Sequence, residues 1–157
     1  MKKLRLSVII LLFVTVNAFA QSPIGDGGQQ FNFGVGLSNS GFPVYASYDF
    51  GVHPDITVAP MVQFNLDGFD YMIFSGRGDY HFNTLLDIPQ TWDFYAGLNV
   101  GFAAYFGDDN GDNDGISGLD LGAQIGGRWY WNDKWGLNLE FAGGKGWGTR
   151  FGLSMKM

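Results

Sequence analysis

The sequence contains no cysteine, and charged residues make up only 15% of its 157 positions. The absence of cysteine excludes disulfide scaffolds, thiolate metal sites and cysteine nucleophiles. Basic residues are few, nine Lys and Arg against 15 Asp and Glu, and the formal charge of −6 argues against a nucleic-acid partner. Glycine and aromatic residues are abundant, with 25 glycines and 17% aromatics, which is too aromatic for disorder. The length predicts one domain.

The N-terminal segment 1–20 has the pattern of a secretory signal peptide. Three basic residues precede the apolar stretch 7–17, and Ala18-Phe19-Ala20 forms a small-x-small cleavage site. The stretch is shorter than the ~20 residues that a membrane-spanning helix needs, so a retained anchor is the less favoured alternative. We expect cleavage after Ala20. The mature chain 21–157 then keeps six Lys and Arg against 15 acids, a formal charge of −9.

Apolar and polar residues alternate with period two from Gln30 to the last residue, which is typical of β-strands, and no mature segment shows a helical period. Turn residues such as Asp67-Gly68 and Asn132-Asp133 separate the alternating runs. The pattern predicts eight strands, at residues 29–38, 43–50, 56–66, 69–82, 92–106, 118–131, 135–142 and 147–157.

Each predicted strand has one apolar face free of charged residues and one polar face rich in glycine and short side chains. A closed eight-stranded barrel has an interior just wide enough for side chains, so the face with the many large aromatics does not fit inside. That face must point outward, where lipid tolerates an apolar belt that would aggregate in water. A soluble lipocalin-like barrel would need the apolar face inward.

Lipid also requires the sheet to close, because open edges leave backbone groups unpaired in hydrocarbon. The sequence therefore predicts an all-β fold: a closed eight-stranded antiparallel up-and-down transmembrane β-barrel with a polar interior.

Aromatic residues gather at the predicted strand ends, as in the interfacial girdles of transmembrane barrels. In an up-and-down order, one rim carries Tyr80, Phe82, Trp92, Trp129, Trp131 and Trp135, and the other carries Phe106 and Trp147.

Four features together resemble a known family: the Ala18-Phe19-Ala20 processing site, the strand end 77–82, the run 92–98 and the alternating last strand. The mature chain is similar to the small eight-stranded outer-membrane barrels of the OmpA, OmpX and OmpW type, particularly the minimal barrels of Bacteroidetes-like bacteria. It departs from them in ending with Met157, where these barrels commonly end in an aromatic residue.

The resemblance implies a place in the outer membrane of a Gram-negative cell envelope, with both termini, and hence the tryptophan-rich rim, in the periplasm. It also implies that outer-membrane lipid and the barrel assembly machinery are the partners. We expect a monomer.

The polar faces carry charges of both signs. We expect a lumen polar network of Asp49, Arg77, Asp79, His81, Asp93, Asp120, Arg128, Glu140, Arg150 and Lys156. Folding the hairpins places Glu140 opposite Arg150, and Asp93 opposite His81. Desolvated charges need partners, so we favour a self-satisfied network that holds the lumen shut. The alternative is a gate whose pairs exchange to admit ions or small solutes.

An acidic loop contains oxygen ligands at alternate positions and a glycine, as at the start of an EF-hand-type calcium loop. The candidate ligands are Asp108, Asn110, Asp112 and Asp114. Leu121 stands at the twelfth position and supplies no bidentate carboxylate. We favour a solvated acidic loop over a calcium site, and expect weak affinity for any bound ion. No other cofactor is predicted.

The only two histidines offer little to a catalytic mechanism. His81 beside Asp93 imitates two members of a triad, but no serine is predicted nearby, so we predict no catalytic residue. The sequence thus favours a non-enzymatic outer-membrane barrel with a structural or surface-interaction role. The alternative is a narrow OmpW-like channel or binding pocket for small solutes, and a lipid-modifying enzyme ranks third.

Overall fold

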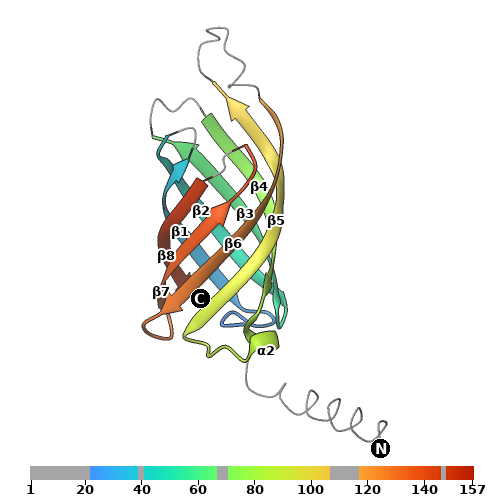
Figure 1. The fold of residues 1–157 in the computed structure, drawn as a ribbon, viewed down its shortest axis with the longest axis vertical. Helices are drawn as coiled ribbons and strands as arrows, with labels where there is room; N and C mark the ends of the chain where they lie inside the picture. The colour runs from blue at the N-terminus through green and yellow to red at the C-terminus, as the bar shows by residue number, and fades with distance from the viewer. Residues whose placement is uncertain (1–21, 39–40, 67–70, 107–116, 146–147) are drawn as a thin grey trace, which may run out of the picture.

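The computed structural model describes residues 22–38, 41–66, 71–106, 117–145 and 148–157. Eight antiparallel strands form a closed barrel in which each strand pairs with its neighbours in sequence and β8 pairs with β1 (Figure 1). Their bounds are β1 Gln29–Ser38, β2 Pro43–His53, β3 Ile56–Asn65, β4 Tyr71–His81, β5 Trp92–Tyr105, β6 Gly118–Tyr130, β7 Trp135–Ala142 and β8 Gly148–Lys156. The predicted fold class is confirmed.

The predicted strands agree with the observed ones to within three residues at each end, apart from those ends that fall outside the described residues. The largest difference is at the end of β2, which was predicted to end at residue 50 and continues to His53. Its pairing with β3 shifts register between Gly51 and His53. The sequence also misses one element, the single helical turn α2 (Asn83–Leu86), which ends at Asp87 in a left-handed conformation with φ 52°. One turn is too short to show a helical period. Among the described residues, no helix has the length and apolar character to cross a membrane.

Alternate side chains point to opposite faces of every strand, as the pleat of a β-strand requires. The outward positions carry exposed apolar residues, among them Phe74 with 57% and Leu98 with 70% of their surface exposed. The inward positions carry buried polar and charged residues, among them Asp49, Arg128 and Glu140. The barrel is therefore apolar outside and polar inside, as the sequence predicts.

Gly34 and Gly152 pair where β1 meets β8 and the barrel closes. A Cβ atom on Gly34 would lie 2.2 Å from the carbonyl oxygen of Phe151, and one on Gly152 would lie 2.1 Å from that of Phe33. A side chain cannot occupy either position, so the closing seam requires glycine at both.

Candidate functional site

The structure places all ten residues of the predicted polar network on the inner face of the barrel. Nine of them are buried, and Lys156 at the end of β8 is partly buried. Seven of the ten take part in ion pairs, namely Asp49, Arg77, Asp79, Asp93, Arg128, Glu140 and Arg150, and His81 contacts Asp93. The pairs connect β2, β4, β5, β6, β7 and β8, so the network ties strands together across the lumen.

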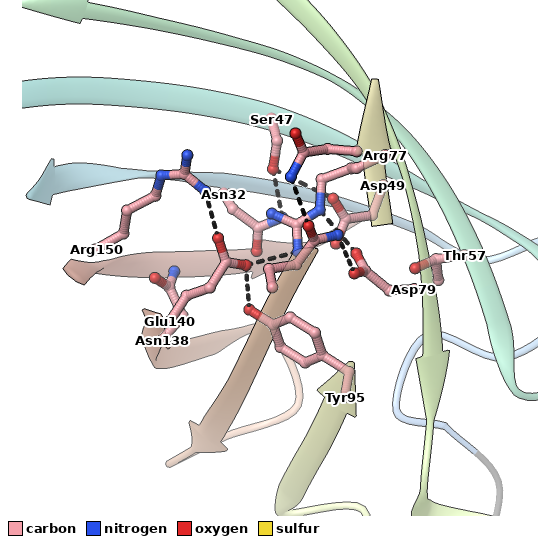
Figure 2. A network of polar contacts seen from close by, with 12 residues as sticks. Asn32, Ser47, Asp49, Thr57, Arg77, Asp79, Tyr95, Asn138, Glu140 and Arg150 are labelled. Atoms are coloured by element: carbon pink, nitrogen blue, oxygen red, sulfur yellow. Dashed lines mark hydrogen bonds and ion pairs between the residues drawn. The ribbon is translucent and has the colours of Figure 1, made fainter. Parts of the chain in front are cut away.

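Glu140 on β7 is the centre of one group of contacts (Figure 2). Its Oε2 accepts hydrogen bonds from Arg77 Nη2 at 2.6 Å and from the Tyr95 hydroxyl at 2.9 Å. Its Oε1 accepts one from Arg150 Nη1, also at 2.6 Å. Arg77 in turn donates from Nε to Asp79 Oδ2 at 2.8 Å. One carboxylate thus holds two guanidinium groups and a phenol.

Arg128 on β6 is the centre of the second group. Its Nη2 donates to Asp49 Oδ2 at 2.6 Å and its Nη1 to Asp93 Oδ2 at 2.9 Å. Charge-assisted hydrogen bonds of this length are roughly twice as strong as neutral ones. Because Asp49 lies on β2 and Asp93 on β5, the two ion pairs of Arg128 connect β6 with β2 and β5 across the lumen.

Tyr95 lies between the two groups and was not among the predicted site residues. The guanidinium carbon of Arg128 lies 4.3 Å from the centre of its ring and that of Arg77 lies 5.6 Å away, within the range of cation–π attraction. Two more tyrosines, Tyr45 and Tyr130, are also buried inside and donate their hydroxyls to Asn138 and Gln30. All three stand at polar-face positions of their strands, so the alternation in the sequence already indicates that they point inward. The lumen therefore holds large aromatic rings as well as the expected short side chains.

His81 connects Asp93 to the hydroxyl of Thr57, a residue that was not among the predicted site residues. Its Nδ1 lies 2.7 Å from Asp93 Oδ1, and its Nε2 lies 2.9 Å from Thr57 Oγ1. The order carboxylate, imidazole, hydroxyl is that of a catalytic triad. All three side chains are buried, however, with at most 1% of their surface exposed. Pairing of the β3 and β4 hairpin, with Thr57 opposite Asp79, is the signal that could have placed this threonine near His81.

Asp120 and Lys156 lie apart from these groups. Asp120 accepts a hydrogen bond from the backbone N–H of Lys145 at 2.5 Å, so it holds the chain after β7. Lys156 places its ammonium 3.8 Å from the ring centre of Tyr130. The predicted network therefore divides into an ion-paired centre and two separate charges.

Among the described residues, the cavity between the two groups of ion pairs is very small. A cavity of about 10 Å³ remains between side chains that include Tyr45, Arg77, Tyr95 and Glu140. A cavity needs roughly 10–15 Å³ to hold a single water molecule. The centre is therefore filled by the protein's own side chains.

The aromatic residues predicted at the periplasmic rim gather in contacting groups. Trp92 lies 6.3 Å from Trp129 between ring centres, Trp129 lies 6.3 Å from Trp131, and Tyr80 lies 5.3 Å from Phe82. Trp135 begins β7 at the same end, beside the β6–β7 turn.

Phe106 follows β5 at the opposite end and has 67% of its surface exposed. The partner predicted for it at that rim, Trp147, lies outside the described residues.

The predicted calcium ligands Asp108, Asn110, Asp112 and Asp114 lie outside the described residues, as does the segment 1–20. Calcium binding and signal-peptide cleavage therefore stay predictions. Within the described ranges, no group of three or more His, Cys, Asp or Glu is arranged to hold a metal ion.

An eight-stranded barrel with an apolar exterior and a polar, ion-paired interior has the architecture of small transmembrane barrels. Comparison with solved structures agrees. The N-terminal β-barrel domain of Pseudomonas aeruginosa OprF superposes with a TM-score of 0.71 at 12% identity, covering 85% of this chain and 99% of that one. A de novo designed transmembrane β-barrel gives 0.63 at 15% identity, covering 84% and 97%.

The Yersinia pestis outer-membrane protein Ail gives a TM-score of 0.53 at 17% identity, covering 84% of this chain and all of that one. No family model and no curated protein matches the sequence. The chain thus has the fold of the small eight-stranded outer-membrane barrels.

Proposed function

We propose that the protein is an integral outer-membrane β-barrel with a closed lumen, which acts structurally or through its surface rather than by conducting solutes. The observation that carries this proposal is the filled centre, where the ion pairs of Glu140 and Arg128 leave a cavity of only about 10 Å³. A solute would have to break several buried ion pairs to pass, and breaking such a pair costs about 3–5 kcal/mol.

Conductance in planar lipid bilayers tests the closed lumen. The wild-type protein should give no steady current above leak. Tyr95→Ala removes the ring between the two ion-paired groups and should give a measurable current. That current would show that the barrel inserts into the bilayer under the same conditions. Heat-modifiable gel migration checks that both proteins are folded. Stepwise steady currents from the folded wild-type barrel would instead support the narrow-channel alternative.

A lipid-modifying activity has less support. The Thr57, His81 and Asp93 side chains have the order of a triad, but none is accessible to a lipid substrate. We therefore propose that His81 is a buried hydrogen-bonding residue. An altered lipid A composition in cells that carry wild-type protein, lost on His81→Gln substitution, would contradict this.

The apolar exterior supports a membrane location, and the fold supports the outer membrane of a Gram-negative cell. We propose that the segment 1–20 directs export, that the barrel assembly machinery inserts the chain, and that the monomer sits with its tryptophan-rich rim toward the periplasm. Recovery in detergent-extracted outer envelopes, with a gel shift on boiling, tests the location. Recovery in the soluble fraction would overturn it.

A further inference from the structure

One side of the outer wall is hollowed by two apolar grooves of about 480 Å³ each. The wall formed by β5, β6 and β7 faces the viewer in Figure 1, with β8 and β1 following at its edge. The β1–β2 groove is lined on the outer face by Phe33, Val35, Val44 and Leu153, and the β5–β6 groove by Trp92, Phe94, Ile125, Trp129, Leu139 and Phe141. Leu137 and Phe151 line both grooves, so they form a ridge between them.

Gly127 contributes to the depth of the β5–β6 groove. It occupies an outward position on β6, in register with Phe94 on one side and Leu139 on the other. Between these two large side chains, the missing side chain leaves a notch in the apolar belt. A Cβ atom at this position would meet the Phe94 ring at 3.1 Å, so a larger side chain would occupy the groove.

A basic side chain stands at the rim below the ridge. Along β7 and β8, the Leu137–Leu153 pair is followed toward the tryptophan-rich rim by the Trp135–Met155 pair, and Lys134 directly precedes Trp135. Lys134 is exposed. The other described basic residues at this end are Arg128, which points into the lumen, and Lys156, which lies over Tyr130. Lys134 is thus the basic group available to a ligand that sits on the ridge from outside.

We propose that these two grooves and Lys134 form a binding site for one two-chain phospholipid of the surrounding leaflet. One acyl chain lies in each groove, the glycerol lies at the rim end of the ridge beside Leu137, and the phosphate faces Lys134. Two neighbouring apolar grooves that share one ridge match two chains joined at one end. A second barrel would present a convex wall, which does not enter grooves on either side of a ridge. This inference rests on the proposed membrane location.

Native mass spectrometry of the folded barrel in detergent tests the site, with 1-palmitoyl-2-oleoyl phosphatidylethanolamine as the probe. Gly127→Leu should weaken binding by about tenfold or more, because the new side chain takes the place of part of one acyl chain. Lys134→Ala should weaken it by roughly two- to fivefold, as for an exposed charge pair. Lysophosphatidylethanolamine, with one chain, should bind at least about tenfold more weakly than the two-chain lipid.

Gly76→Leu is the matched control. Gly76 is also an outward glycine, on β4 away from both grooves, and a Cβ atom there meets nothing within 4 Å. This variant should bind the lipid as the wild type does. Equal binding by Gly127→Leu and wild type, equal binding of the one-chain and two-chain lipids, or a dimer in place of the lipid adduct would overturn the proposal. Gel migration distinguishes failure of the lipid site from failure of the proposed membrane location. A barrel that folds into bilayers but does not bind the lipid contradicts only the lipid site.

Discussion

The lumen next to the tryptophan-rich rim and the lumen at the opposite end are filled by different means. Near that rim, Arg128 is paired with Asp49 and Asp93, and the ion pairs continue along the lumen through Arg77 to Arg150, close to the far end of β8. At the opposite end, Tyr71, Ile73 and Ala103 form a buried apolar cluster against Tyr105. Between the two lies a neutral hydrogen bond from Asn99 to Gln124 at 2.8 Å.

This difference determines what each half tolerates. A buried ion-pair network depends on every partner being present, since a charge left without its partner keeps its full desolvation cost. An apolar cluster depends on filled volume, and it loses stability in proportion to the cavity that a smaller side chain leaves. Substitutions chosen for each half therefore separate charge balance from packing.

Removal of the Glu140 charge should have the largest effect. Glu140→Gln leaves Asp79 as the carboxylate paired with Arg77 and removes the carboxylate that pairs with Arg150, which keeps the neutral Gln63 side-chain oxygen. We expect the free energy of unfolding to fall by about 4 kcal/mol, as for other buried charges that lose their partner. Urea unfolding from lipid vesicles, followed by gel migration, measures the change.

The double variant Glu140→Gln with Arg150→Gln tests the cause of that loss. Removing both charges of the pair should restore part of the lost stability, because the unpaired guanidinium is then gone. If the double variant loses more free energy of unfolding than the two single variants lose together, charge balance is not the cause.

Ile73→Ala should have the next largest effect, in the opposite half. Ile73 is 1% exposed and lies in the cluster with Tyr71 and Ala103. We expect a loss of about 3 kcal/mol from the cavity and the lost burial, measured by the same unfolding assay. Ile73→Val should lose only about 1 kcal/mol. Similar losses for both variants would show that packing does not control this half.

The fold was predictable because alternation with period two is a local property of the chain. Each outward aromatic and inward polar residue follows from its place in one strand, and adjacent hairpins bring Glu140 opposite Arg150. The wider network was not predictable in this way. Arg77 and Glu140 are 63 residues apart, and Arg128 and Asp49 are 79 apart. Their contacts depend on barrel closure and on strand stagger, which no single hairpin specifies.

The inward tyrosines show a second limit of the sequence. Weighing faces by their large aromatics predicts that rings point outward, and this is correct for the tryptophans at the rim. Tyr45, Tyr95 and Tyr130 are among the exceptions, and each donates its hydroxyl to a polar partner in the lumen. A buried tyrosine usually requires such a partner, which only the assembled barrel supplies.

Thr57→Val should have the smallest effect on the free energy of unfolding. It tests, within the charged half, how much the Thr57 hydroxyl contributes compared with the ion pairs. The substitution keeps the branched shape and removes the hydroxyl that lies 2.9 Å from His81 Nε2, while the His81 contact with Asp93 stays intact. We expect a loss of about 1 kcal/mol, the usual contribution of one hydrogen bond, and a smaller loss for Thr57→Ser, which keeps the hydroxyl. A loss as large as that of Glu140→Gln, measured in the same urea series, would show that His81 is held by this hydroxyl rather than by the carboxylate. The hydrogen bond would then belong to the cooperative network instead of lying at its edge.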